Sequence, residues 1–414
     1  MTFHVAWTYI ITFLDFFGIS IFIPLLSGHL KSLGASHFFI GVLSSVYAGC
    51  QLLSGPIIGS LSDRLGRQNI LIFCLIITCV SYFLMGLTNS LFFMLFLRIT
   101  LGIFKHIQSL TRTIIADHIS SKEQTIIFGR INAIAGISFT LGPAIGGHFA
   151  EFKNGFFYIC SFTSFIFMLN IAIVYFYLED SPRDKMKKED KKYVNKIELT
   201  NLIKIIPNNL IDAIRRLGNI NWNEYLDLFL IKFLTSVAKD CYVNNYSIKV
   251  RERFQVSAKL IGYSLSLQGF FAALSGLSIR YSNKLLFKNK LNLEKHNIMI
   301  HIFVSLCYLV VAFTERVEIF VFFGMLLAFA NVILRVREAE ILFERCPESE
   351  RGSLTGMGTS ITNIARMLTP LIVGIVEDIY GLGSGIILGL IISILAIFVS
   401  INANRTKAVI MKND

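Results

Sequence analysis

The chain has 414 residues, of which 54% are hydrophobic and only 16% are charged. Soluble domains usually carry about 25% charged residues, so this composition excludes a soluble enzyme of one or two domains. The formal net charge of +12 would suit a nucleic-acid-binding protein, but Lys and Arg in the cytoplasmic loops of a membrane protein produce the same excess.

Long apolar runs, separated by charged residues or by Gly and Pro, follow one another along the chain. A membrane-spanning helix needs about 20 apolar residues, and each run is close to that length. The run at 224–243 is the weakest of them, because several charged residues interrupt it. The sequence predicts an all-α membrane protein whose twelve spans lie at 5–26, 38–58, 69–88, 91–116, 127–149, 156–178, 224–243, 258–280, 296–314, 317–336, 353–378 and 382–401.

The runs form two sets of six on either side of a basic segment. The halves resemble each other weakly, because a shift of 227 residues carries Pro143 to Pro370 and Gly147 to Gly374. Two duplicated six-helix halves are a known transporter design. We therefore expect two pseudo-symmetric bundles. The expected domains are a first bundle at 1–178, a cytoplasmic linker at 179–223, a second bundle at 224–402 and a cytoplasmic tail at 403–414.

Most Lys and Arg outside the spans fall in alternate connecting segments, with the largest group in the linker. Cytoplasmic loops carry the excess of these residues, so both termini are expected in the cytoplasm. This topology accounts for the net charge without nucleic acid. In a predicted external loop, Asn245 begins an Asn-Tyr-Ser glycosylation sequon.

The segment after the second predicted span reads Gly-Ser-Leu-Ser-Asp-Arg-Leu-Gly-Arg at 59–67. A short turn shaped by glycine would present one carboxylate and two guanidinium groups at the cytoplasmic surface, where they can pair with neighbouring helix ends. This order resembles the loop signature of the major facilitator superfamily. The resemblance implies a fold of two six-helix bundles, with a gating role for Gly59, Asp63, Arg64, Gly66 and Arg67.

The same resemblance implies that Arg67 pairs with Asp117 and that Asp63 contacts the N-terminus of the eleventh helix. The corresponding segment of the second half, around 282–284, lacks the acidic and arginine residues. The fifth span is similar to the antiporter signature of the superfamily, in which glycines allow close helix contact and Pro loosens the backbone. Its motif residues are Gly136, Gly142, Pro143, Gly146 and Gly147.

Further motifs resemble the drug:proton antiporters related to tetracycline efflux proteins. They are Asp15 with Phe16, Phe17 and Gly18 in the first span, Gln51 ahead of Pro56, and Arg98 with Gly102 in the fourth span. The stretch 101–108 also resembles the "major facilitator superfamily domain-containing protein 9" type.

Asp15 lies about 15 Å from the inner end of its span at 1.5 Å per residue. A charge at this depth is costly and usually faces a partner or a water-filled cavity. The fourth span contains two cations that could pair with Asp15. The family resemblance favours Arg98, whereas Lys105 is expected at nearly the same depth in the membrane as Asp15. The spacing of this span predicts one polar face, an arc of about 80° that holds Arg98, Gly102, Lys105, Ser109 and Arg112.

One hypothesis is that Asp15 exchanges a proton in competition with its cation, with His106 as a second proton site. The alternative is a permanently ionised structural pair. Cations outnumber carboxylates inside the spans, which favours an organic anion as substrate. The candidates for the substrate cavity are Gln51, Gln108, Arg112, Lys232, Asn331, Asn363 and Arg366.

The leading functional prediction is a secondary active transporter of a small organic solute that works by alternating access. The alternatives are a non-transporting receptor or scaffold, and a cationic-drug/proton antiporter. No catalytic, phosphate-binding or metal-binding motif is visible, and the seven Cys are expected to pack among apolar side chains. We expect a monomer in a lipid bilayer, with a small molecule and a proton as partners and no cofactor.

Overall fold

The computed structural model describes residues 2–119, 121–178, 222–244, 246–286, 293–347 and 350–413. These residues form helices joined by short turns, and no strand occurs among them. The predicted linker lies outside the described residues except for its last two positions, and Asn245 also lies outside them.

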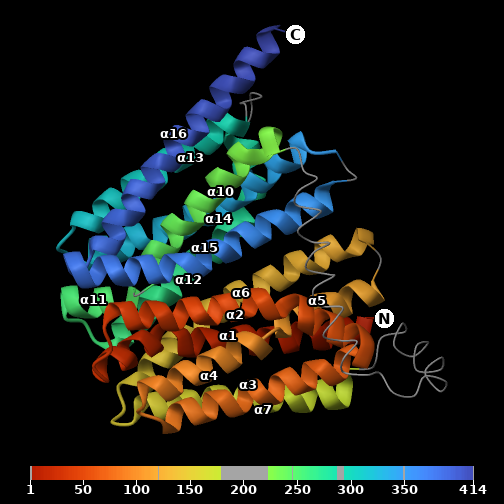
Figure 1. The fold of residues 1–414 in the computed structure, drawn as a ribbon, viewed down its shortest axis with the longest axis vertical. Helices are drawn as coiled ribbons and strands as arrows, with labels where there is room; N and C mark the ends of the chain where they lie inside the picture. Colours follow the sequence, from red (N-terminus) through yellow and green to blue (C-terminus); the bar gives the residue numbers. More distant parts are fainter. Residues whose placement is uncertain are drawn as a thin grey trace. The chain divides into compact units, whose positions relative to one another are not determined.

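The helices of the first half follow the predicted spans in order (Figure 1). The fourth predicted span corresponds to two of them, α4 and α5. The helices are α1 (Thr2–Ser32), α2 (His37–Leu65), α3 (Arg67–Leu87), α4 (Leu91–Phe104), α5 (Ile107–His118), α6 (Ser121–Ala150) and α7 (Gly155–Tyr177).

The second half repeats this order and adds one short helix, α11, in the segment predicted as an external loop. The C-terminal tail continues the last helix through Asn413. The helices are α10 (Trp222–Val243), α11 (Tyr246–Phe254), α12 (Ala258–Leu286), α13 (Leu293–Phe313), α14 (Val317–Arg345), α15 (Arg351–Tyr380) and α16 (Ser384–Asn413).

Ten helical segments are long and apolar enough to cross a membrane, with α4 and α5 together forming one of them. The other two predicted spans are the helices α10 and α12, which are more polar. A helix stands at each of the twelve predicted positions, which confirms the predicted fold class.

Several helices extend beyond their predicted ends. The segment 59–65, predicted as a loop, is the last part of α2, and 282–284 lies within α12. Hydropathy marks where a helix leaves the apolar layer, whereas backbone hydrogen bonding lets the helix continue into water. The predicted spans therefore end before the helices do, wherever a helix continues into a charged segment.

The described chain divides into two compact units. The first contains residues 1–26 and 46–219, and the second contains residues 27–45 and 220–414. The end of α1 and the start of α2 thus belong to the second unit, so both helices contribute to both units.

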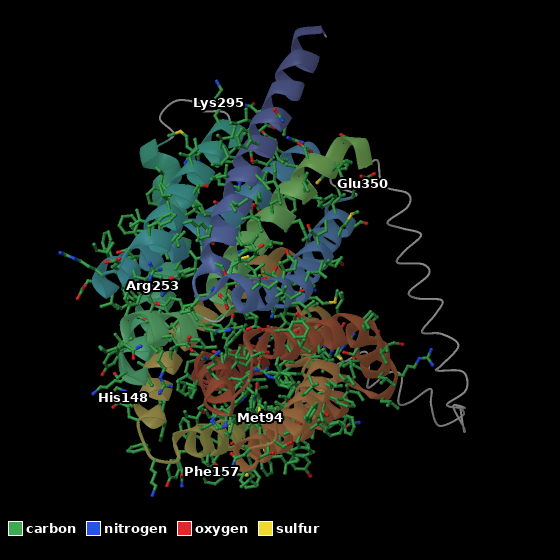
Figure 2. The ribbon with its side chains drawn as sticks, turned by 60° about the vertical axis from the view of Figure 1, so that its left-hand side comes forward. Met94, His148, Phe157, Arg253, Lys295 and Glu350 are labelled. Carbon is green, nitrogen blue, oxygen red and sulfur yellow. The ribbon has the colours of Figure 1, made fainter. Side chains whose placement is uncertain are left out.

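In the first unit, α3 packs along α7. Between them the rings of Tyr82 and Phe167 stack with centroids 5.4 Å apart, and Phe22 of α1 meets Tyr82 edge-on at 4.8 Å. Figure 2 shows His148 at the end of α6, Phe157 at the start of α7 and Met94 at the start of α4 on one side of this unit. Helix starts and ends meet there, as consecutive antiparallel spans require.

In the second unit, α10 packs on α15 and α16, and α14 packs on α12 and α13. An aromatic group fills the space among these helices, and the hydroxyl of Tyr308 donates a hydrogen bond to the carbonyl oxygen of Ala238 at 2.8 Å. The other large rings of this core are Tyr242, Tyr246 and Phe320.

Candidate functional site

Asp15 is 1% exposed, and both of its carboxylate oxygens are held by side chains of the fourth span. The Lys105 ammonium lies 2.5 Å from Oδ1, and the Gln108 amide donates to Oδ2 at 3.1 Å. Of the two cations that the sequence offered, the structure pairs Asp15 with Lys105. A buried charge is tolerated when it is paired and hydrogen-bonded in this way.

The residues that hold Asp15 lie at a break in the fourth span. Helix α4 ends at Phe104 and α5 begins at Ile107, so Lys105 and His106 are not helical. The Lys105 carbonyl accepts a hydrogen bond from the Gln51 amide at 2.9 Å. The His106 ring shares a hydrogen bond of 2.8 Å with the Ser54 hydroxyl. Side chains of α2 thus satisfy polar groups that the broken helix leaves open.

The break corrects the prediction of one continuous polar face along the fourth span. Arg98, Gly102 and Lys105 are buried, whereas Ser109 and Arg112 beyond the break are exposed. A non-helical pair of residues changes the angular register, so the two parts of the span do not share the arc expected of a regular helix. Gln108, the next polar residue after the break, faces Asp15 instead.

Arg98 lies between two aromatic rings. Its guanidinium carbon is 5.4 Å from the ring centroid of Phe22 on α1 and 5.3 Å from that of Tyr47 on α2. Lys105 has a similar contact, because its ammonium lies 4.6 Å from the ring centroid of Phe167. The two cations that the sequence offered as partners of Asp15 therefore both rest on aromatic faces, which attract positive charge.

Lys232, a predicted cavity residue, lines a small cavity of the second unit together with Asn297 and Glu338. One oxygen of Glu338 and the side-chain oxygen of Asn297 are buried without a hydrogen bond. Glu338 is not among the predicted cavity residues, because the tenth predicted span ends at 336, whereas α14 continues to Arg345. Extending the helical periodicity of the tenth span beyond its first charged residues would have placed Glu338 on this helix.

The remaining cavity candidates of the second unit make no hydrogen bond or ion pair with one another among the described residues. The amide of Asn331 donates to the Leu327 carbonyl of its own helix at 2.9 Å. Asn363 is half-buried, and Arg366 is exposed. Their assignment to a substrate cavity stays a prediction.

The predicted gating motif forms a compact polar cluster in the first unit. Arg67 reaches Asp117 at 2.5 Å, Asp63 at 2.7 Å and the Ser62 hydroxyl at 3.1 Å. Gly66 separates α2 from α3 with φ of 97°, a backbone conformation that glycine adopts without steric cost. The pair of Arg67 and Asp117 agrees with the prediction, whereas the predicted contact of Asp63 with the eleventh helix would join the two units and stays a prediction.

The glycine motif of α6 lies against α1 in the first unit. A Cβ added to Gly146 would lie 2.6 Å from the Ile21 carbonyl oxygen, and one added to Gly142 would overlap the Ser20 hydroxyl. Two of the motif glycines therefore permit the backbones of the helices to approach closely, as small residues do in membrane proteins.

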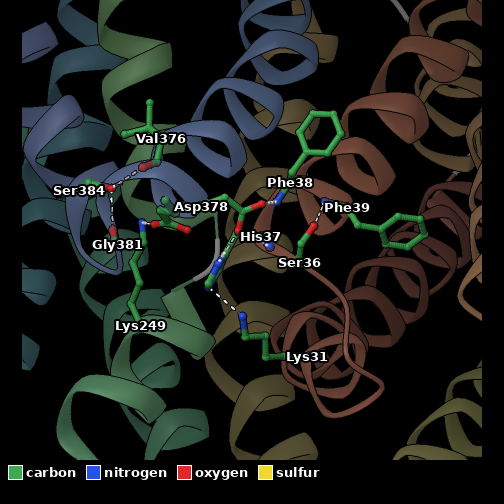
Figure 3. A network of polar contacts seen from close by, with 11 residues as sticks. Lys31, Ser36, His37, Phe38, Phe39, Lys249, Val376, Asp378, Gly381 and Ser384 are labelled. Carbon is green, nitrogen blue, oxygen red and sulfur yellow. Dashed lines mark hydrogen bonds and ion pairs between the residues drawn. The ribbon is translucent and has the colours of Figure 1, made fainter.

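A polar network at the start of α2 was not predicted (Figure 3). The Asp378 carboxylate of α15 accepts hydrogen bonds from the backbone N–H groups of His37 and Phe38 at 3.0 and 2.9 Å. The His37 ring nitrogen Nδ1 lies 3.0 Å from the same carboxylate, and Lys31 lies 3.4 Å from Nε2. A carboxylate from α15 thus caps the N-terminus of α2 within the second unit.

The residue before Asp378 belongs to a second, fully buried ion pair. The Lys249 ammonium lies 3.0 Å from Oε1 of Glu377 in an ion pair, and the side chains of Glu377 and Lys249 are 0% and 2% exposed. The same ammonium donates to the Cys241 carbonyl at 2.9 Å (Figure 3 labels Lys249). Lys249 was expected in an external loop, whereas α11 buries it.

Long apolar helices with ion pairs buried between them define a multi-pass integral membrane protein of the solute-transporter class. The sequence profile of the Major Facilitator Superfamily matches residues 8–336, and the chain belongs to this family. The predicted family is confirmed.

One relative is similar over most of the chain, and another is similar over less than half of it. The quinolone resistance protein NorA of Staphylococcus aureus (strain MSSA476) is 24% identical over 372 residues, which cover 89% of this chain and 88% of the relative. The tetracycline resistance protein, class H, of Pasteurella multocida is 29% identical over 185 residues, which cover 44% of each chain.

Solved structures show the same fold. A bacterial homologue of the human lysosomal transporter Spinster, in an inward-facing and occupied conformation, has a TM-score of 0.78 at 12% identity, covering 97% of this chain and 96% of that one. The human organic anion transporter MFSD10 (TETRAN) has a TM-score of 0.61 at 19% identity, covering 96% and 98%.

Proposed function

We propose that the protein is a secondary active transporter that moves a small organic anion across its membrane by alternating access, with Asp15 as the proton-exchanging group. The supporting observation is the buried cluster of Asp15, Lys105 and Gln108 at the helix break. Protonation of Asp15 would weaken its attraction to Lys105 and free that ammonium. Proton binding and a rearrangement at the break are therefore coupled.

The charges of the spans support an anionic substrate. Three carboxylates are already paired, since Asp15 faces Lys105, Asp227 lies 2.7 Å from Arg345 and Asp240 lies 3.5 Å from Lys239. Among the described residues, no ion pair is found for three arginines of the spans. They are Arg98, Arg112 and Arg366. A surplus of fixed positive charge favours a negatively charged solute, and MFSD10 is itself named as an organic anion transporter.

The proposal includes a monomer with both termini in the cytoplasm. A cationic-drug/proton antiporter is the second candidate, because NorA and the class H tetracycline protein are named for drug resistance. The two candidates share the role of Asp15 and differ in the charge of the solute.

Purified protein in proteoliposomes tests this function. An inward pH gradient and matched anionic and cationic probes are applied, and uptake of an anion that depends on the gradient is expected. Asp15→Asn should abolish the dependence on pH, whereas Glu151→Gln, at an exposed turn after α6, should leave uptake unchanged. Flux of cations alone would overturn the anion assignment. Flux unaltered in Asp15→Asn would overturn the proton site, and binding without flux would favour a receptor or scaffold.

A further inference from the structure

Arg98 is a buried cation to which the structure assigns no anion. The residue is 7% exposed, and its Nε is buried without a hydrogen-bond acceptor. Among the described residues it has no ion pair and no hydrogen bond, and its contacts are the faces of Phe22 and Tyr47.

The charge of this side chain is permanent. An arginine keeps its proton under all physiological conditions, so it cannot adapt to burial by becoming neutral. Aromatic faces attract the guanidinium but accept none of its five N–H groups in an ordinary hydrogen bond. The buried guanidinium therefore has unsatisfied N–H donors, and a negatively charged acceptor would stabilise it.

The nearest predicted anion does not supply this acceptor, because both oxygens of Asp15 are bound to Lys105 and Gln108. Tyr47, whose ring face contacts the guanidinium, also carries a hydroxyl group that can donate a hydrogen bond. Its hydroxyl oxygen accepts a hydrogen bond from the Gln51 amide at 3.4 Å, so its own proton is available to an acceptor. Arg98 and Tyr47 therefore present donors from α4 and α2 and no acceptor of matching charge.

We infer that Arg98 binds the anionic head group of the transported solute, with the Tyr47 hydroxyl as a second donor. A carboxylate fits best, because its two coplanar oxygens match the fork of paired N–H groups of a guanidinium. The aromatic rings around the fork favour a solute whose anionic group is attached to an apolar body. The inference rests on the proposed transport function and separates two roles, since Asp15 with Lys105 carries the proton and Arg98 holds the solute.

Equilibrium binding to the purified, full-length protein tests the anion site. The probes are benzoate, naphthalene-2-carboxylate and octanoate, each compared with its neutral carboxamide of nearly equal shape. At least one acid should bind the unmodified protein about tenfold or more tightly than its amide, as a charge-assisted pair requires. Equal binding of every acid and amide, or no binding of any acid, overturns the inference.

Substitutions assign the preference to Arg98. Arg98→Gln should abolish the preference for the acid and leave binding of the amide unchanged. Arg98→Lys should retain part of the preference, because it keeps the charge and loses the fork. Tyr47→Phe, which removes one hydroxyl, should reduce acid binding by a few fold. Arg130→Gln, at an exposed arginine of α6, is the matched control and should bind like the unmodified protein.

Binding of the amide distinguishes a misfolded Arg98→Gln protein from one that has lost only the anion site. A misfolded protein would bind neither the acid nor the amide. If Arg98→Gln binds neither, Arg98→Lys and Tyr47→Phe decide the question, and an unchanged acid preference in both overturns the inference. Asp15→Asn should keep the acid preference while losing proton-driven uptake. Anion uptake that is unaffected by Arg98→Gln would leave transport standing and remove the anion site. Acid binding that depends on Arg98, in a protein that shows no uptake, would support the anion site and overturn the proposed transport function.

Discussion

Arg67 contacts two carboxylates whose surroundings differ. The Asp117 side chain is 8% exposed, whereas that of Asp63 is 54% exposed. Water screens the second pair, so it contributes little to stability, whereas a charge left alone in the first pair would be buried. The arginine of the gating motif is thus held mainly by Asp117.

Replacing Arg67 tests this difference. Arg67→Met should lower the free energy of unfolding by about 3–5 kcal/mol, because it removes one side of the buried ion pair with Asp117. Arg67→Met combined with Asp117→Leu should recover much of the loss, since neither charge remains. Melting temperatures in detergent give the measurement, with Asp63→Asn as a control that costs about 1 kcal/mol or less. Equal losses in the single and the double variant would contradict this view.

At the scale of the helix, two features decide the arrangement of the first unit. The break at Lys105 and His106 directs Gln108 toward Asp15, although neither Pro nor Gly stands at the break. The contact of α6 with α1 is close, because Gly146 lies against the backbone carbonyl of Ile21 and Gly142 lies against the small side chain of Ser20. The first feature comes from tertiary contacts, and the second is visible in the sequence as a glycine motif.

The helix contact predicts opposite effects for two glycines of α6. Gly146→Ala should destabilise the protein by about 1–3 kcal/mol, because the new methyl group meets the Ile21 carbonyl, which cannot rotate away. Gly129→Ala on the same helix, where nothing lies within 4 Å of the new atom, should be neutral or stabilise by up to about 1 kcal/mol. Thermal unfolding in detergent compares the two. A Gly146→Ala protein as stable as Gly129→Ala would show that α6 does not pack as closely as described.

For the whole molecule, the number of crossings fixes the side on which the termini lie. Ten segments are long and apolar enough to be spans, and α10 and α12 are not among them. The side of the membrane on which each later turn lies therefore depends on whether α10 and α12 cross. Both are helices of full spanning length, with 22 and 29 residues. An even number of crossings places both termini on one side, and we predict from the distribution of Lys and Arg that this side is the cytoplasm.

Topology reporters test this prediction. A cytoplasm-dependent fluorescent protein should be active at both termini, and a reporter inserted at 151–154, the turn between α6 and α7, should respond as an external one. A reporter at 314–316, between α13 and α14, is the corresponding site of the second half and should also be external. Opposite responses of the two turns would mean that α10 or α12 does not cross.

The sequence by itself determined the membrane class, the positions of the spans, the family and the pair of Arg67 with Asp117. These features depend on local hydropathy, on the charge of loops or on an ordered motif, and each can be recognised within a few dozen residues. The sequence also selected Asp15 and its two candidate cations, because charged residues in apolar runs are conspicuous.

Only the tertiary structure decided which cation Asp15 contacts and which one lies between aromatic rings. It also revealed the helix break, the burial of Lys249 with Glu377, the cap that Asp378 places on α2, and Glu338 beyond a predicted helix end. Each of these depends on residues that are distant in the chain or on a helix that continues past its apolar part. Hydropathy specifies which segments enter the membrane, but the partner of a buried charge depends on how helices rotate and pack against one another.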